Sequence, residues 1–100
     1  MSAAHVLLLE VTLAIPAATT LKDRRRVVRS LIDRAGAANN AAISLLEADD
    51  DPRRAKLGIV VVGGSSSQVR DQIDGLERLC WSRPEIEVRE TERTWMEVDR

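Results

Sequence analysis

The chain has 100 residues, with 15 Lys and Arg against 16 Asp and Glu, a single Cys, and two aromatic residues, both Trp. A length of this order corresponds to one domain, which we assign to residues 1–100. No apolar run approaches the ~20 residues that a membrane helix needs, so we exclude a transmembrane protein and expect no membrane partner. The lone Cys80 excludes an internal disulfide, a zinc ribbon and a CxxC redox site.

The N-terminus lacks the pattern of a secretory signal. Residues 1–9 contain no Lys or Arg, and Glu10 interrupts the apolar stretch that follows. We therefore expect a cytoplasmic protein.

Alternating apolar residues predict four strands. They cover residues 6–15, 41–47, 57–62 and 86–98. The third segment is apolar on both faces, which favours a central place in a sheet. In the fourth, apolar residues at even positions, among them Val88 and Met96, alternate with charged residues. We expect these even positions to share a buried face, with the charges directed outward.

A first helix is predicted over residues 21–35. Thr20 and Asp23 form an approximate capping pair at its start, since the hydroxyl accepts from a free amide and the carboxylate faces the positive end of the helix dipole. Gly36 suits the left-handed turn that closes many helices. The apolar stripe consists of Val27, Val28, Leu31, Ile32 and Ala35.

A second helix is predicted to begin after Ser65 and to end before Pro84. Ser65 with Gln68 three residues later fits a capping box more closely than the first helix start does. Its apolar stripe consists of Val69, Ile73, Leu76, Leu79 and Cys80. We expect Cys80 to be a core residue.

The order strand, helix, strand, strand, helix, strand is that of a ferredoxin-like βαββαβ fold. In this α+β architecture two helices pack on one face of an antiparallel sheet whose first and third strands are central. The opposite face would carry Val6, Leu8, Glu10, Thr12, Val60 and Val62. Soluble monomers rarely expose an apolar patch of more than a few hundred Å², so we expect a homodimer or a larger homo-oligomer that covers this face.

Positive charge is concentrated in the first predicted helix. Residues 20–34 carry six cations against two acidic residues, a charge of +4, whereas the rest of the chain carries −5. The cations that we expect to bind nucleic acid, by contacting phosphates, are Lys22, Arg25, Arg26 and Arg29.

A competing interpretation is a solvated helix face whose charges pair with the acidic stretch 87–97 or with an acidic partner. A net charge of −1 and a pI near 5.8 favour this alternative, because nucleic-acid-binding domains are usually basic. The absence of Phe and Tyr argues against a platform that stacks single-stranded bases.

Other chemistry-bearing residues have ordinary structural interpretations. Residues 63–67 read Gly-Gly-Ser-Ser-Ser but lack the lysine and the spacing of a nucleotide-binding loop. The contiguous residues 49–51, all Asp, do not alternate as calcium ligands do, and we expect a solvated loop. His5 has no partner in any motif, and Trp81 and Trp95 each stand alone. We expect no catalytic residues, no metal site and no cofactor, and hence no enzyme.

One string in the first predicted helix resembles a known family. Residues 20–31, Thr-Leu-Lys-Asp-Arg-Arg-Arg-Val-Val-Arg-Ser-Leu, resemble the signature of the YlxP-like family of small bacterial proteins of unknown function. Leu9-Glu10-Val11 with Ile15-Pro16, and residues 54–58, also resemble family features, so the similarity covers about residues 6–92. The resemblance implies a ferredoxin-like fold and, through the family's genomic association with translation factors, a role near RNA or the ribosome.

Two function classes follow from these observations. The first is a non-enzymatic accessory protein whose partners are RNA or ribosomal particles, bound through the basic helix. The second is an ACT-like module that binds small molecules or regulates as an oligomer, since that class shares the topology. Gly63 and Gly64 are the residues that favour the second class.

Overall fold

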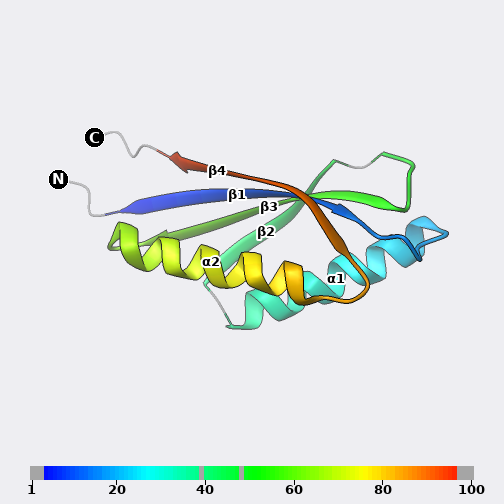
Figure 1. Cartoon of the computed structure of the whole chain (residues 1–100). Helices are drawn as coiled ribbons and strands as arrows, with labels where there is room; N and C mark the ends of the chain where they lie inside the picture. Colours follow the sequence, from blue (N-terminus) through cyan, green and yellow to red (C-terminus); the bar gives the residue numbers. More distant parts are fainter. Residues whose placement is uncertain (1–3, 39, 48, 97–100) are drawn as a thin grey trace.

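The computed structural model describes residues 4–38, 40–47 and 49–96. The elements are β1 (His5–Ala14), α1 (Leu21–Ala38), β2 (Ala41–Glu47), β3 (Arg54–Gly63), α2 (Ser66–Ser82) and β4 (Glu87–Met96). The strands form one antiparallel sheet in the order β2-β3-β1-β4, and both helices lie on one side of it (Figure 1). This arrangement confirms the predicted ferredoxin-like fold with β1 and β3 at the centre.

The two central strands supply most of the sheet's share of the core. In β1 the alternate residues Leu7, Leu9, Val11 and Leu13 are at most 1% exposed, as the period-two pattern predicts. Their partners in β3 are Val61, Ile59, Leu57 and Ala55, which are also buried. Each large aliphatic side chain removed from water in this way contributes about 1.5 to 3 kcal/mol. Aliphatic packing between the central strands and the helices therefore supplies the core.

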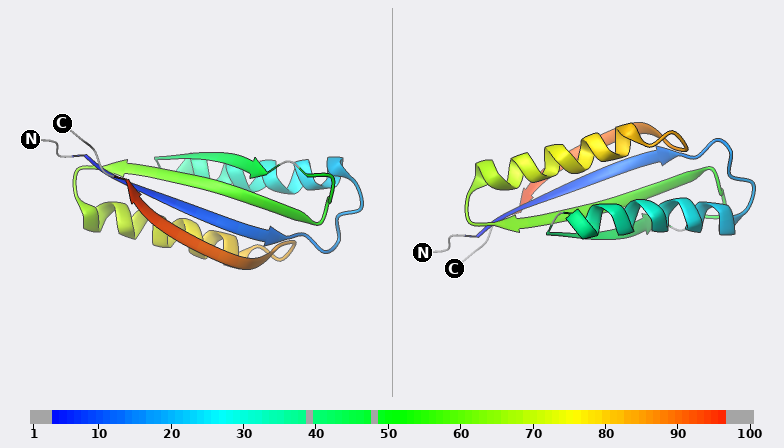
Figure 2. Two further views of the ribbon diagram at one scale, coloured as in Figure 1. Left: turned by 90° about the horizontal axis from the view of Figure 1, so that it is seen from above. Right: turned by 90° about the horizontal axis from the view of Figure 1, so that it is seen from below.

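The helices divide the covered face of the sheet between them. Helix α1 packs over β2 and β3, whereas α2 packs over β1, β3 and β4. The view from above in Figure 2 shows the opposite face of the sheet with no helix in front of it, and the view from below shows the two helices side by side. Helix α1 and strand β4 consequently lie toward opposite edges of the domain.

The side chains of β4 that point toward the helices switch from even to odd positions along the strand. Val88 lies opposite the buried Leu13, but the register shifts by one residue immediately afterwards. Beyond this bulge Trp95, and not Met96, is the residue opposite the buried Leu7. The prediction that Val88 and Met96 share a buried face is therefore wrong, because the extra residue of a bulge reverses the alternation of side chains.

The end of α1 also differs from the sequence prediction. The helix continues to Ala38, so Gly36 lies within it, and none of the described glycines has a positive φ. The predicted left-handed residue at position 36 is thus wrong. At the start of α2 the prediction is confirmed, because the Ser65 hydroxyl accepts a hydrogen bond from the backbone N–H of Gln68 at 3.2 Å.

Candidate nucleic-acid interface

Helix α1 begins at a reciprocal cap. The Thr20 hydroxyl accepts from the backbone N–H of Asp23 at 3.0 Å, while Oδ2 of Asp23 accepts from the backbone N–H groups of Thr19 and Thr20 at 3.0 and 3.1 Å. The Thr19 hydroxyl also donates to Oδ2, at 2.9 Å. These hydrogen bonds, chiefly that from the Thr19 backbone, lower the pKa of Asp23 from 3.8 to about 2. The cap fixes where the cations of the first two turns point.

The buried stripe of α1 determines which of its cations face solvent. Val27, Val28, Leu31 and Ala35 are at most 8% exposed and face the sheet and α2. The four predicted phosphate-contacting residues, Lys22, Arg25, Arg26 and Arg29, are all exposed. At 100° per residue they occupy an arc of about 100° on the side away from the core. We call these four residues the basic face.

The basic face carries unpaired charge. Among the described residues, none of Lys22, Arg25, Arg26 and Arg29 forms an ion pair with an acidic side chain. Lys22 and Arg29 are seven residues apart, so the face extends about 10 Å along the helix axis. These side chains are therefore available to neutralise negative charge on another molecule.

Arg24 differs from its neighbours, and no local sequence pattern indicates this difference. It is 7% exposed, and its Nη1 donates to the backbone carbonyls of Asp49, Asp51 and Arg54 at 2.9, 3.1 and 3.4 Å. The carboxylate of Asp49 lies 3.5 Å away. Arg24 is thus a structural residue that organises the connection between β2 and β3, and it does not add to the surface charge of α1.

The acidic residues 49–51 serve the same connection. Asp49 accepts from Nη2 of Arg54 at 3.0 Å, and Asp51 accepts from the backbone N–H of Arg53 at 2.9 Å. The backbone hydrogen bond from Arg53 and the charges of the two arginines lower the pKa of Asp51. The expectation of a merely solvated loop is therefore incomplete, because two of its three carboxylates hold arginines.

Most cations outside α1 are already engaged. Within the described part of the chain, the residues that form ion pairs are Arg53, Arg54, Lys56, Arg83, Arg89 and Arg93. Arg70 lies over the ring of Trp95 at 5.9 Å from its centroid. The available positive charge is therefore concentrated on α1.

The alternative in which α1 pairs with the acidic last strand has no support within the described residues. Glu87 pairs with Arg89 of its own strand at 3.0 Å. Arg93 of β4 pairs with Asp74 and Glu77 of α2, at 2.8 and 3.2 Å. Because α1 and β4 lie toward opposite edges, the basic face does not meet the described part of the last strand.

A groove of about 310 Å³ runs beside the basic face, between α1 and the edge strand β2. Its apolar lining consists of Leu21, Val28, Ile32 and Leu45. Arg25 and Arg29, one helical turn apart, also line this groove, as does the buried Arg24. The basic face is thus bordered by a depression on its β2 side.

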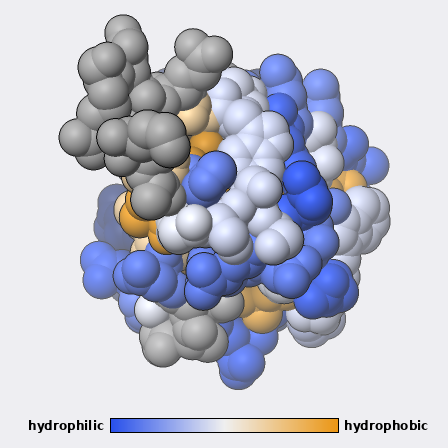
Figure 3. Space-filling view, turned by 90° about the vertical axis from the view of Figure 1, so that its left-hand side faces the viewer, coloured by the Kyte–Doolittle hydropathy of each residue, from blue (hydrophilic) through white to orange (hydrophobic). Residues whose placement is uncertain are grey.

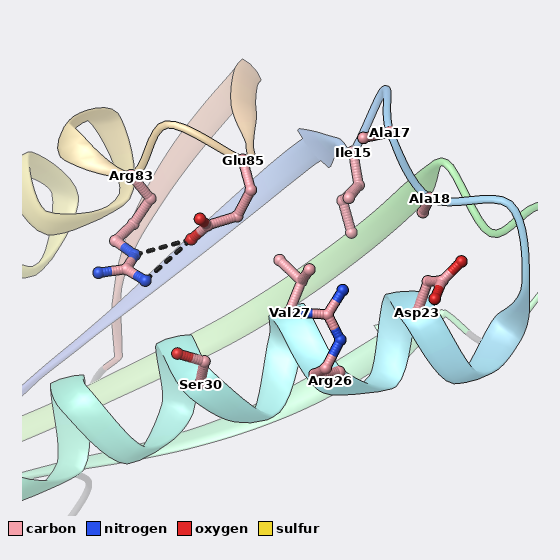
Figure 4. A pocket seen from close by; sticks show the side chains of 9 residues that line it. All are labelled: Ile15, Ala17, Ala18, Asp23, Arg26, Val27, Ser30, Arg83 and Glu85. Atoms are coloured by element: carbon pink, nitrogen blue, oxygen red, sulfur yellow. Dashed lines mark hydrogen bonds and ion pairs between the residues drawn. The ribbon is translucent and has the colours of Figure 1, made fainter.

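A second cavity, of about 270 Å³, lies on the other side of the basic face (Figure 4). Arg26, Asp23 and Ser30 line its α1 wall, and the pair formed by Arg83 and Glu85 lines the opposite wall. The Arg83 Nη2 and Glu85 Oε1 atoms are 2.9 Å apart. The floor is apolar, so the cavity combines one unpaired guanidinium with hydrophobic surface.

The remaining candidates have structural roles. Gly63 ends β3 where a Cβ would approach the side chain of Val69 to 2.9 Å, so this glycine is required by packing. His5 is the first residue of β1 and is partly buried. Cys80 is 1% exposed, and burial raises the pKa of its thiol to about 11, which makes it unreactive. Trp81 is 62% exposed on α2.

Two further properties concern the described residues as a whole. No group of three or more His, Cys, Asp or Glu side chains among them is placed to hold a metal ion. None of the described helices has the length and apolar character needed to cross a membrane.

The fold is shared with solved structures of designed proteins. One, titled de novo designed protein LFR1 1 with ferredoxin fold, has a TM-score of 0.51 and 21% identity, and covers 94% of this chain and 88% of its own. Another, the de novo designed protein Foldit4, has a TM-score of 0.52 and 10% identity, and covers 91% and 96%. The chain is thus a small α+β protein of the ferredoxin-fold class with a basic face on its first helix.

The family follows from the sequence match. The chain belongs to the family described as protein of unknown function (DUF503), whose model matches residues 6–93. No curated protein matches the chain.

Proposed function

We propose that this protein is a non-enzymatic accessory factor that binds structured RNA, on ribosomal particles, through the basic face of α1. The observation that carries the proposal is the contrast among its cations: the basic face is exposed and unpaired, whereas Arg24 and most arginines elsewhere are held by acidic groups or carbonyls. The resemblance of residues 20–31 to the YlxP-like signature supports the same direction.

The mode of recognition follows from what the surface lacks. The two aromatic residues of the chain, Trp81 and Trp95, are on α2 and on β4, away from the basic face. Sequence-specific reading of unpaired bases relies on aromatic stacking, so this interface contacts phosphates and reads shape instead. Each neutralised phosphate releases counterions and adds about 0.7 to 0.9 to the slope of log K against log salt. Four cations predict a slope of about 3.

The test is binding to purified ribosomal subunits and to a fluorescent RNA hairpin, measured by anisotropy across a series of salt concentrations. The double variant Arg25→Glu/Arg29→Glu should bind at least tenfold more weakly and show a shallower salt dependence. The matched control is Arg70→Glu/Arg78→Glu, which makes the same charge change at exposed positions on α2. The control should bind like the unmodified protein.

Two outcomes contradict the proposal. Binding that the α1 double variant retains in full would place the interface elsewhere. An equal loss in both double variants would show that only net charge matters, so that no interface exists on α1.

A second candidate function is the binding of a small anionic molecule in the cavity of Figure 4, in keeping with an ACT-like module. The unpaired Arg26 beside an apolar floor favours this function. A carboxylate or phosphate of the bound molecule would pair with the guanidinium of Arg26, while the apolar part of that molecule contacts Ile15 and Val27. Gly63 and Gly64 lend it no support, since Gly63 serves packing against Val69. A thermal-shift screen with amino acids and nucleotides tests this function, and Arg26→Gln should abolish any shift.

A further inference from the structure

The uncovered face of the sheet, which we call the open face, is organised in rows across β4, β1 and β3. Residues directly opposite one another in the two registers share a face, so each row can be read from the pairing. The four rows are Met96-Val6-Val62, Thr94-Leu8-Val60, Glu92-Glu10-Gly58 and Glu90-Thr12-Lys56. Two rows are mainly apolar and two are charged.

The apolar rows lie at the end of the sheet where β1 begins and β4 ends. Met96 is 49% exposed and Val62 is 48% exposed, and Val6, Leu8 and Val60 between them are partly exposed. Figure 3 views this end and shows hydrophobic surface between hydrophilic side chains. No described segment of the chain covers these rows, because both helices lie on the other side. A contiguous apolar surface of this kind marks an interaction site.

One of the two charged rows has opposite signs on either side of β1, with Glu90 on β4 and Lys56 on β3, whereas the other has Glu92 on β4 and Gly58 on β3. Glu90 and Glu92 of β4 form no ion pair within the described residues. Lys56 of β3 lies 3.5 Å from Glu10, its Nζ facing Oε2. The acidic side of the open face repels phosphate, so RNA does not fit here. The pattern suits a protein surface that is apolar at one end and acidic opposite basic at the other.

We propose that the open face binds a second copy of the same chain. The two copies pack face to face about a twofold axis that runs along β1. Such an axis keeps each row level and exchanges β4 with β3. Glu90 then faces Lys56 of the second copy, and Met96 faces Val62 of the second copy. Leu8 meets its own equivalent on the axis. The open face is therefore complementary to itself in hydrophobicity and, in the row of Thr12, in charge.

Glu10 also lies on the proposed axis. Two carboxylates meeting there would repel, but the ion pair with Lys56 draws each Glu10 side chain toward β3 and away from the axis. Packed sheets are about 10 Å apart, which leaves room for the two carboxylates to turn away from each other.

The available area corresponds to a weak, reversible dimer. With the axis along β1 the strands that overlap are β4, β1 and β3, and β2 lies outside the contact. Ten-residue strands are about 33 Å long and three strands span about 14 Å. This gives about 460 Å² for each copy, or about 920 Å² in total, which is in the size range of weak or transient interfaces.

The first test is the molecular mass in solution, measured by light scattering at tens of micromolar. We expect about twice the 11.1 kDa of the chain. Leu8→Glu should give the mass of a single chain while circular dichroism remains unchanged. Trp81→Glu is the matched control, because it introduces the same charge at an exposed apolar residue on the helix side, and it should leave the dimer intact.

The second test fixes the position of the axis by crosslinking with a short bismaleimide. The facing backbones are too far apart for a disulfide, and the native Cys80 stays unreactive because it is buried. Leu8→Cys should crosslink to itself. A mixture of Thr94→Cys and Val60→Cys should crosslink to each other more than either does alone.

Each alternative result overturns the proposal. A mass of one chain for the unmodified protein excludes the dimer at these concentrations. An oligomer that persists in Leu8→Glu must assemble through another surface, such as the edge of β2. A dimer in which Trp81→Cys crosslinks as efficiently as Leu8→Cys would place the interface on the helix side.

Discussion

The Nη1 atom of Arg24 donates to the backbone carbonyl of Asp49 at 2.9 Å, and so joins the first turn of α1 to the connection between β2 and β3. The same nitrogen lies within hydrogen-bonding distance of two further carbonyls in that connection. A buried guanidinium that satisfies several carbonyls contributes mainly through the desolvation penalty incurred when it is removed. The contact therefore separates one structural arginine from the cations around it.

This contact predicts that Arg24 and its neighbour Arg25 contribute differently to the free energy of unfolding. Arg24→Leu should lower the free energy of unfolding by about 2 to 4 kcal/mol, because three backbone carbonyls lose the guanidinium that donates to them. Arg25→Leu, at an exposed position one residue along, should change it by no more than about 0.5 kcal/mol. Urea denaturation monitored by circular dichroism measures both. Equal values for the two variants would contradict the structural role of Arg24.

The cap of α1 predicts a dependence of stability on pH. The pKa of Asp23 is lowered in the folded state from 3.8 to about 2, so its contribution is complete above about pH 4 and is lost as the pH falls through about 2. Asp23→Asn lacks this carboxylate. The stability difference between the unmodified protein and the variant should therefore be largest above pH 4 and should shrink toward pH 2. Thermal unfolding over this range measures the difference, and a gap that widens on acidification would be inconsistent with the cap.

Two glycines in β3 should respond differently to the same substitution. A Cβ at Gly63 would lie 2.9 Å from Cγ2 of Val69, which is fully buried, so Gly63→Ala should lower stability by about 1 to 3 kcal/mol. A Cβ at Gly58 would lie 2.9 Å from Cδ2 of Leu46, whose side chain is 47% exposed and free to move. Gly58→Ala should therefore change stability by less than about 1 kcal/mol. Chemical denaturation of both variants provides the comparison.

The thiol of Cys80 should react very slowly with thiol reagents in the folded protein. Its side chain is 1% exposed and burial raises its pKa to about 11, so the reactive thiolate is scarce at pH 8. A chromogenic disulfide reagent should label the native protein at least a hundredfold more slowly than the urea-unfolded chain. Trp81→Cys, exposed on the same helix, supplies the positive control because its added thiol should react at once. Rapid labelling of the unmodified native protein would disprove the buried position.

Much of the fold was predictable because its signals are local. The alternation in β1 and the caps at Thr20 and Ser65 depend on residues within a few positions of one another, and these were confirmed. The order of the elements then left the ferredoxin-like topology as the natural arrangement. The exposure of the basic face was also predictable, because the spacing of Val27 and Leu31 determines which side of α1 is buried.

Other features depended on residues that are distant in the sequence. The reversal of β4 after Val88 comes from its pairing with β1, about 75 positions earlier along the chain, and no local pattern encodes a bulge. The burial of Arg24 depends on carbonyls in the β2–β3 connection, which only the folded sheet brings to the start of α1. The apolar spacing of α1 and its dipole were compatible with either a buried or an exposed side chain at Arg24.

The sequence by itself determined the class of fold, the residues of the core and the concentration of cations in residues 20–34, because hydrophobic periodicity and helix caps act over a few residues. Only the tertiary structure decided which of those cations are free. It placed α1 and β4 toward opposite edges of the sheet and enclosed Arg24, so that among the described residues no acidic side chain forms an ion pair with the basic face. Electrostatic pairing depends on distance in space, and residues far apart in the sequence set that distance only once the sheet has formed.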